Sequence, residues 1–369
     1  MNKANEHTAA RLFPGWRTKL KANRGRAVLF GLVLLLIFIV LLSADKGALE
    51  ISQGQIFAIF LKNFGVRLPF EFTIQQESTL LDIRLPRIAL GLLVGAALGI
   101  SGAAMQGLFR NPLADPSLVG ISSGAGLAAT AFVIVGDAVS FSLSPFFQLF
   151  AFPVFAFGGA LLTTLMIYRL STIAGQTVVS TLLLAGIAIN ALAQAVAGFL
   201  TFYATDTQIR SLTFWKLGSL GGGNWSSVLT ITPFVLVPII IFPRLARPLN
   251  ALLLGESEAG HIGFDIERIK KLIIVLVALA VGASVAFTGL ISFVGLVVPH
   301  LLRLLVGADH RYLLPGSALL GASLLLAADL IARTLVAPAE MPIGVLTAIT
   351  GAPFFLWLLL RDRKWRIIH

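Results

Sequence analysis

The chain of 369 residues contains no cysteine, which excludes both a disulfide framework and a thiolate metal site. Acidic residues are scarce as well: 17 Asp and Glu accompany 28 Lys and Arg, and charged residues make up only 12% of the chain. Soluble domains carry about twice that charged fraction. Hydrophobic residues reach 57%, and they form several runs long enough to cross a bilayer as helices. The composition therefore excludes a soluble fold and predicts an all-α polytopic membrane protein.

Sequence motifs for chemistry are also missing. There is no GxxxxGK[ST] loop, so we expect that the chain cannot hydrolyse ATP by itself. There is no GxSxG or HExxH motif and no pair of carboxylates within a span, so we expect no enzyme. The five histidines lack metal-ligand spacing, and we expect no metal site and no bound cofactor: His7, His261, His300, His310 and His369. The scarcity of acidic residues in the spans argues against a proton-coupled transporter.

The apolar runs predict ten membrane spans. They are 27–44, 88–109, 117–135, 146–168, 178–203, 228–243, 272–288, 291–306, 312–332 and 343–360. Residues 1–26 hold seven Lys and Arg and are expected to form a flexible cytoplasmic arm, followed by one ten-helix domain in 27–369. Between the first two spans, Ser52 and Gln55 have the spacing of a capping box, which predicts a short amphipathic helix at the surface.

The distribution of positive charge predicts the orientation. If residue 1 is cytoplasmic, the segments on the inner side carry 20 Lys and Arg and the outer segments carry 8. This bias agrees with the positive-inside rule and with both termini in the cytoplasm. The net charge of +11 is thereby read as a topology signal and not as a surface for nucleic acid.

The span 88–109 has no charged residue and carries Gly91, Gly95 and Gly99 at intervals of four. Small residues at this spacing allow a neighbouring helix backbone to approach closely. The span ends in the polar, proline-containing segment 110–116, as in a tightly packed helical hairpin of any polytopic protein. A weak internal repeat relates span 88–109 to span 272–288, which would enter from the opposite side; glycine-rich helices also resemble one another by chance.

Two polar features allow a plain and a functional interpretation. Asp329 and Arg333 are four residues apart in a span and are expected to form a local ion pair. Residues 244–271 form a charged loop, with a short helix expected near 256–262, which is either an ordinary capped surface loop or a site for a partner protein.

Long motifs in the sequence match a known family. They include IRLPR at 83–87, SGAAMQGLFRNPLADPSLVGISSGAG at 101–126, LLLAGIAINAL at 182–192, LNALLLGE at 249–256, and almost every residue of 287–333. With these motifs the chain resembles the permease subunits of bacterial ABC importers for iron-siderophores, haem and vitamin B12. The resemblance extends from about residue 27 to the end of the chain.

The resemblance implies a multi-pass protein of the bacterial inner membrane with the ten-helix fold of the vitamin B12 permease. It implies a homodimer with the pore on its two-fold axis, a periplasmic binding protein outside, and two ATPase subunits inside that bind ATP and magnesium. The loop 244–271 would then couple the permease to the ATPase. The coupling residues would be Gly255, Glu256, Glu258, Ala259, Gly260, His261 and Gly263.

The resemblance also implies roles at the two ends of the pore. By motif position, Arg84, Arg87 and Arg333 would pair with glutamates of the binding protein. The cytoplasmic gate would be formed by Asn111 and Leu113 in one turn and by Gln176, Thr177 and Val178 in another. The second turn departs from the Ser/Thr-rich version of the vitamin B12 permease.

The segment 201–222 looks most like haem permeases. Apolar walls would come from Phe199, Phe202 and Tyr203, and Arg210 would meet a haem propionate, unless it only marks a helix end in water. We therefore expect the permease subunit of a haem importer. A ferric-siderophore or cobalamin importer on the same scaffold is the first alternative, and an ion-coupled secondary transporter or a membrane enzyme is disfavoured.

Overall fold

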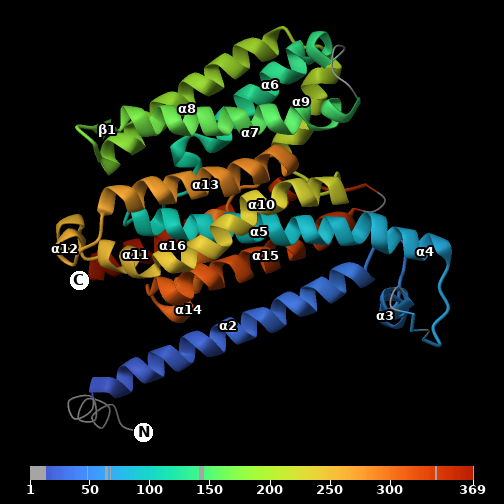
Figure 1. Ribbon diagram of the computed structural model, residues 1–369, viewed down its shortest axis with the longest axis horizontal. Coiled ribbons are helices and arrows are strands. Elements are labelled where there is room, and N and C mark those ends of the chain that lie inside the picture. The colour runs from blue at the N-terminus through green and yellow to red at the C-terminus, as the bar shows by residue number, and fades with distance from the viewer. Residues whose placement is uncertain are drawn as a thin grey trace.

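The long helices lie side by side along the longest axis of the protein (Figure 1). The computed structural model describes residues 14–47, 49–62, 65–66, 68–140, 145–336 and 339–368. The long helices are α2 (Pro14–Asp45), α5 (Leu85–Leu108), α6 (Ile121–Ser140), α7 (Pro145–Leu170), α8 (Val179–Phe202), α10 (Trp225–Ile241), α13 (Ile266–Thr288), α15 (His310–Leu335) and α16 (Ile343–Ile368).

Shorter elements connect these helices. The short helices are α3 (Gln53–Lys62), α4 (Ile74–Ser78), α9 (Asp206–Leu217), α11 (Ala246–Leu252), α12 (Glu256–His261) and α14 (Val294–Val306). A π-helical segment at Thr79–Arg84 leads into α5, and 3-10 turns occupy Pro116–Val119 and Phe242–Leu245. Strands β1 (Thr172–Ile173) and β2 (Gln176–Thr177) form a small antiparallel hairpin between α7 and α8.

The predicted all-α membrane fold is confirmed. Within the described residues, seven helices are long and apolar enough to cross a membrane, and three shorter apolar helices accompany them at Ile121–Val135, Val294–Val306 and Ile343–Trp357. Each of the ten expected spans coincides with one of these helices. The expected short helix after the first span is α3, and its capping box is formed: Ser52 N donates to Gln55 Oε1 at 2.9 Å.

Two expectations about the connecting segments need correction. Helix α2 begins at Pro14, so the second half of the predicted flexible arm is helical; residues 1–13 lie outside the described residues. Helix α9 follows the fifth span where only a connection was expected. The expected turn near Thr177 is present and contains a hairpin. The short helix expected near 256–262 is confirmed as α12, and the loop 244–271 also contains α11 and the start of α13 at Ile266.

Helix α5 forms the centre of the structure, with 20 of its 24 residues buried. It runs between α13 and α10 on one side and α15 on the other (Figure 1). A helix that is apolar around its whole circumference is expected in such a position. Its glycines allow the contacts: a Cβ at Gly95 would lie 2.5 Å from Gly321 O, and side chains at Gly99 and Gly102 would collide with backbone carbonyls of α15 and α14.

The two ends of the molecule carry different elements. Helix α12, the hairpin, the start of α2 and the end of α16 lie at one end, and α3, α4 and α9 lie at the other (Figure 1). The described chain therefore begins and ends on the same side, as an even number of spans requires. We call the end with α12 the hairpin end and the end with α3 the α3 end.

The glycine contacts of α5 can be tested by adding one methyl group. The Gly102→Ala variant is expected to unfold at a temperature several degrees lower in detergent, since its Cβ would overlap the backbone at Gly295 and overpacking costs about 1–3 kcal/mol. Gly158→Ala in α7 is the control, because no atom lies within 4 Å of the added Cβ. Equal melting temperatures for the two variants would contradict this account of the core.

Candidate functional site

Two carboxylates hold Arg87 near the start of α5, at the α3 end. Its Nε and Nη2 donate to Asp329 of α15 at 3.0 and 2.8 Å, and its Nη1 donates to Glu340 Oε1 at 2.8 Å. Asp329 is 1% exposed and Arg87 is 8% exposed. A carboxylate buried in a membrane protein needs such a partner, and the planar guanidinium can bind both at once.

The expected local pair of Asp329 and Arg333 is the weaker contact. Arg333 Nε lies 3.7 Å from Asp329, whereas the main partner of Asp329 is Arg87 from another helix. The Arg87 guanidinium also keeps the pKa of the half-exposed Glu340 carboxyl below its ordinary value. We call Arg87, Asp329, Arg333 and Glu340 the outer cluster.

Arg84 and Arg333 bind the end of helix α2. Arg84 Nη1 donates to Ala44 O at 2.6 Å and to Asp45 O at 2.9 Å, and Arg333 Nη2 donates to Ser43 O at 2.5 Å. The last carbonyl groups of a helix have no N–H donor within that helix, and cationic side chains can donate hydrogen bonds to them. The three arginines expected to meet a binding protein thus lie together at the α3 end, and in this conformation each of them also bonds within the chain.

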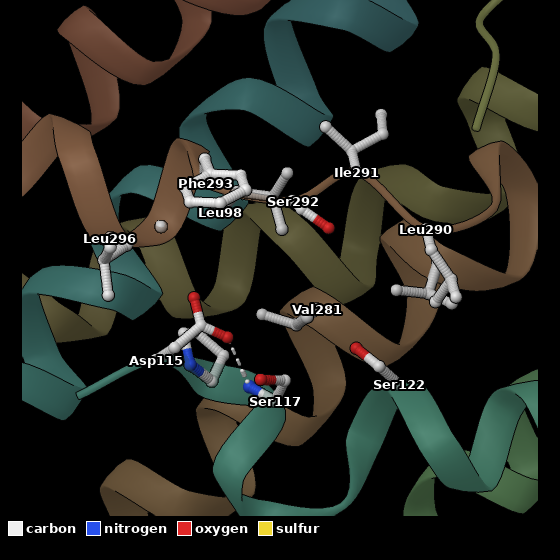
Figure 2. A pocket seen from close by; sticks show the side chains of 13 residues that line it. Leu98, Asp115, Ser117, Ser122, Val281, Leu290, Ile291, Ser292, Phe293 and Leu296 are labelled. Atoms are coloured by element: carbon white, nitrogen blue, oxygen red, sulfur yellow. Dashed lines mark hydrogen bonds between the residues drawn. The ribbon is translucent and has the colours of Figure 1, made fainter. Parts of the chain in front are cut away.

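A cavity of about 350 Å³ lies beside the break that follows α5. Figure 2 shows the side chains that line it. Its walls are mainly apolar side chains such as Leu98, Val281 and Ile291. The polar groups on the wall come from Asp115, Ser117, Ser122 and Ser292, and Ser117 N donates to Asp115 Oδ1 at 2.8 Å. Phe293, also on the wall, has a left-handed backbone with φ of 67°, which is costly for an aromatic residue.

A second cavity of about 480 Å³ adjoins the first, because both are lined by Ser117, Ser122 and Leu290. It continues between α6 and α8 towards α9. Small and neutral side chains line it, among them Gly126, Asn190, Gln194, Ala193, Ala197 and Gly198. Lys216, in the last turn of α9, is the one charged residue on its lining.

The residues expected along the pathway lie near this cavity but not on its lining. Phe199, Phe202 and Tyr203 are more than half exposed at the end of α8, where both phenylalanine rings lie 5.4 Å from the tyrosine ring. Arg210 is exposed in the middle of α9 and therefore marks neither end of that helix. The cationic residue on the cavity wall is Lys216, which sequence reasoning missed because it did not foresee α9. The role of Arg210 stays a prediction.

At the hairpin end, the structure brings the predicted gate and the predicted coupling helix together. A third cavity of about 480 Å³ is lined by Gln176, Thr177 and Val178 of the gate and by Glu256 of α12. Arg110, Glu267 and Lys270 line the same cavity. Lys270 Nζ bonds to Thr177 O, Glu256 and Glu267, and Thr177 N donates to Glu267. We call Thr177, Glu256, Glu267 and Lys270 the inner cluster.

The other gate and coupling residues do not line this third cavity. Asn111 Oδ1 accepts from Leu113 N at 2.9 Å in the turn after α5, and the Leu113 side chain is exposed. Gly255, with φ of 137°, immediately precedes α12. Ala259 is the buried residue of that helix, and Gly263, with φ of 101°, follows it. Of the predicted coupling residues, Glu258, Gly260, His261 and Gly263 are exposed. Beside them lie the exposed apolar side chains Leu253, Leu254 and Ile262.

Within the described residues, no three or more His, Asp or Glu side chains are grouped so that they could hold a metal ion. The functional residues that sequence reasoning missed are Lys216, Glu267, Lys270 and Glu340. A signal for two of them was present, because Glu267 and Lys270 are charged residues in the first turns of an otherwise apolar helix. No local signal pointed to Glu340, whose partner Arg87 is 253 residues away.

A protein-family model matches most of the chain. The model of the FecCD transport family matches residues 34–361. The chain belongs to the FecCD transport family. It is thus a multi-pass permease of the ABC importer class, which lies in the inner membrane of bacteria. Such permeases work in a dimeric arrangement with substrate-binding partners and with an ATPase that is a separate subunit.

Individual relatives cover nearly the whole FecCD chain. The hemin transport permease HmuU of Yersinia pestis is 46% identical over 341 residues, which are 92% of this chain and 97% of HmuU. The vitamin B12 import permease BtuC of Klebsiella pneumoniae is 41% identical over 345 residues, 93% of this chain and 96% of BtuC. A metal-chelate type ABC transporter solved in an inward-facing conformation is 33% identical with a TM-score of 0.77, over 91% of this chain and 99% of that one.

Proposed function

We propose that this chain is the permease subunit of an importer that carries haem across the inner membrane. The identity to a hemin permease over almost the full length of both chains supports haem over the other cargoes of the family. The adjoining cavities support it physically. Their walls combine apolar and neutral polar side chains with one cation, Lys216, which suits a flat apolar ring that carries acid groups, and the carboxylate of Asp115 lies on the wall of the first cavity, away from Lys216 on the second. Cobalamin is the second candidate, because the vitamin B12 permeases are nearly as similar.

The assembly that we propose is a homodimer with two ATPase subunits at the hairpin end and a binding protein at the α3 end. We place the dimer contact at helix α8, where large apolar side chains such as Leu184, Ile187 and Leu192 are exposed. The exposed side chains of Leu253, Leu254 and Ile262 beside α12 support a protein contact at the hairpin end, where water would otherwise meet them. ATP and magnesium would be bound by the ATPase subunits, and both termini would be cytoplasmic.

Transport in vesicles tests this function. The permease, its ATPase and its binding protein are reconstituted, and uptake of haem, cobalamin and a ferric siderophore is compared. We expect ATP-dependent uptake of haem only. Uptake of cobalamin instead would transfer the proposal to the second candidate, and uptake by the permease alone along an ion gradient would refute the ATP-driven mechanism.

Lys216 gives a sharper test of the cargo. Lys216→Met should lower the uptake of haem by roughly fivefold, because it removes a partly exposed ion pair with a propionate. Arg210→Met is the matched control, since Arg210 lies on the same helix but lines neither of the two adjoining cavities. Haem dimethyl ester lacks the acid groups and should be carried equally by wild type and Lys216→Met. If Arg210→Met had the larger effect, the original assignment of Arg210 would stand.

The outer cluster makes a prediction about the binding protein, whose glutamates we propose to meet Arg84, Arg87 and Arg333. Glu340 already occupies Nη1 of Arg87, so an incoming carboxylate competes with it. Glu340→Gln is therefore expected to tighten binding of the binding protein by about two- to fivefold. Glu50→Gln removes another exposed carboxylate, a few residues after the end of α2, and serves as the control. Weaker binding, or an effect no larger than that of Glu50→Gln, would argue against docking at Arg87.

A further inference from the structure

The inner cluster joins three separate parts of the chain through one side chain. Lys270 Nζ lies 2.8 Å from Thr177 O in β2, 2.6 Å from Glu256 Oε2 in α12 and 3.0 Å from Glu267 Oε1 in α13. An ammonium group has three N–H donors, and each has an acceptor here. The residue Lys270 is 2% exposed, so water does not compete for these bonds.

The hairpin depends on this cluster for its position. Each of its strands has two residues, and a hairpin of that size is not stable alone. Thr177 is 3% exposed and is held through both of its backbone groups: its carbonyl accepts from Lys270, and its N–H donates to Glu267 Oε2 at 2.7 Å. The same two side chains thus tie the hairpin, and the start of α8 that follows it, to α13.

Helix α12 reaches the hairpin through the same lysine. Glu256 is the first residue of α12, and its carboxylate binds Lys270. The six-residue helix is otherwise mostly exposed, with Ala259 as its buried residue. A displacement of α12 therefore moves the Glu256 carboxylate. This carboxylate accepts a hydrogen bond from the same ammonium group that donates to Thr177 O.

We propose that Lys270 is the positioning residue that transmits displacement of α12 to the hairpin and thereby converts ATP hydrolysis by the partner into movement of the cargo. This inference rests on the proposed function, in which α12 meets the ATPase. A purely structural role of the cluster would require no movement. In the role proposed for Lys270, α12 and the hairpin move as one unit while the rest of α13 stays packed against α5, α7 and α10.

The first test measures cargo transported per ATP hydrolysed in the reconstituted complex. Lys270→Met should lower this ratio by about tenfold or more, because it leaves two carboxylates without their cation. Lys270→Arg keeps the charge and should restore much of the ratio. Glu256→Gln, at a more exposed position, should lower the ratio with little risk to folding. Lys271→Met changes the neighbouring exposed lysine and should leave the ratio as in wild type.

The outcomes are distinct. If Lys270→Met and Glu256→Gln lower transport and ATP hydrolysis in proportion, the cluster is only structural and the inference is wrong. If the wild-type complex itself shows no ATP-dependent transport, the proposed function is wrong. This result is independent of the variants and is therefore distinct from a failure of the inference about Lys270.

The second test follows the movement directly. The chain has no cysteine, so spin labels can be attached at Ile173→Cys on the hairpin and Ser257→Cys on α12 without removing other thiols. Both side chains are exposed. In the complex, the distance between the labels should stay constant when ATP is added and should broaden in Lys270→Met. A wild-type distance that changes with ATP would show that α12 and the hairpin move independently, which would overturn the inference.

Discussion

The close backbone contact of α5 with α14 and α15 is the constraint on which the rest of the structure depends. Lipid gives apolar helices no hydrophobic reason to associate, so contact must come from packing, and packing needs small residues. Gly95, Gly99 and Gly102 supply them on one face of α5. Once α5 is fixed in the centre, both of its ends are fixed as well: Arg87 at its start and the break with Asp115 after its end.

At each end of the bundle, one buried cationic side chain binds two carboxylates. Arg87 lies in the first turn of α5 and holds two carboxylates, Asp329 and Glu340. Lys270 lies in the second turn of α13, which runs in the opposite direction, and holds Glu256 and Glu267. In each case one carboxylate is anchored on a long helix and the other lies on a connecting segment. A buried cation therefore ties a surface segment to the membrane core at either side, which is where partner proteins would act.

The sequence allowed the helical core to be predicted because its signals are local. The apolar runs marked the ten spans, the glycine spacing marked the contact face of α5, and Ser52 with Gln55 marked the start of α3. Helix α9 was missed because it is too polar to stand out by hydropathy, although Thr205 and Gln208 form the same kind of capping box. The pairs Arg87–Asp329 and Lys270–Thr177 join residues 242 and 93 positions apart, and no periodicity in one sequence reveals such contacts.

The cavities in the middle of the protein carry few charged side chains, whereas the two ends carry buried ion pairs. The adjoining cavities are lined by small, apolar and neutral polar side chains, with Asp115 and Lys216 as the charged residues on their walls. Such walls offer few strong bonds that would retain a ligand. Among the described residues, the ion pairs with a buried member lie instead in the outer and inner clusters. If these cavities hold the cargo weakly, the force that moves it in one direction must come from partner proteins. The two clusters lie at the two ends of the bundle, where we propose that the binding protein and the ATPase bind.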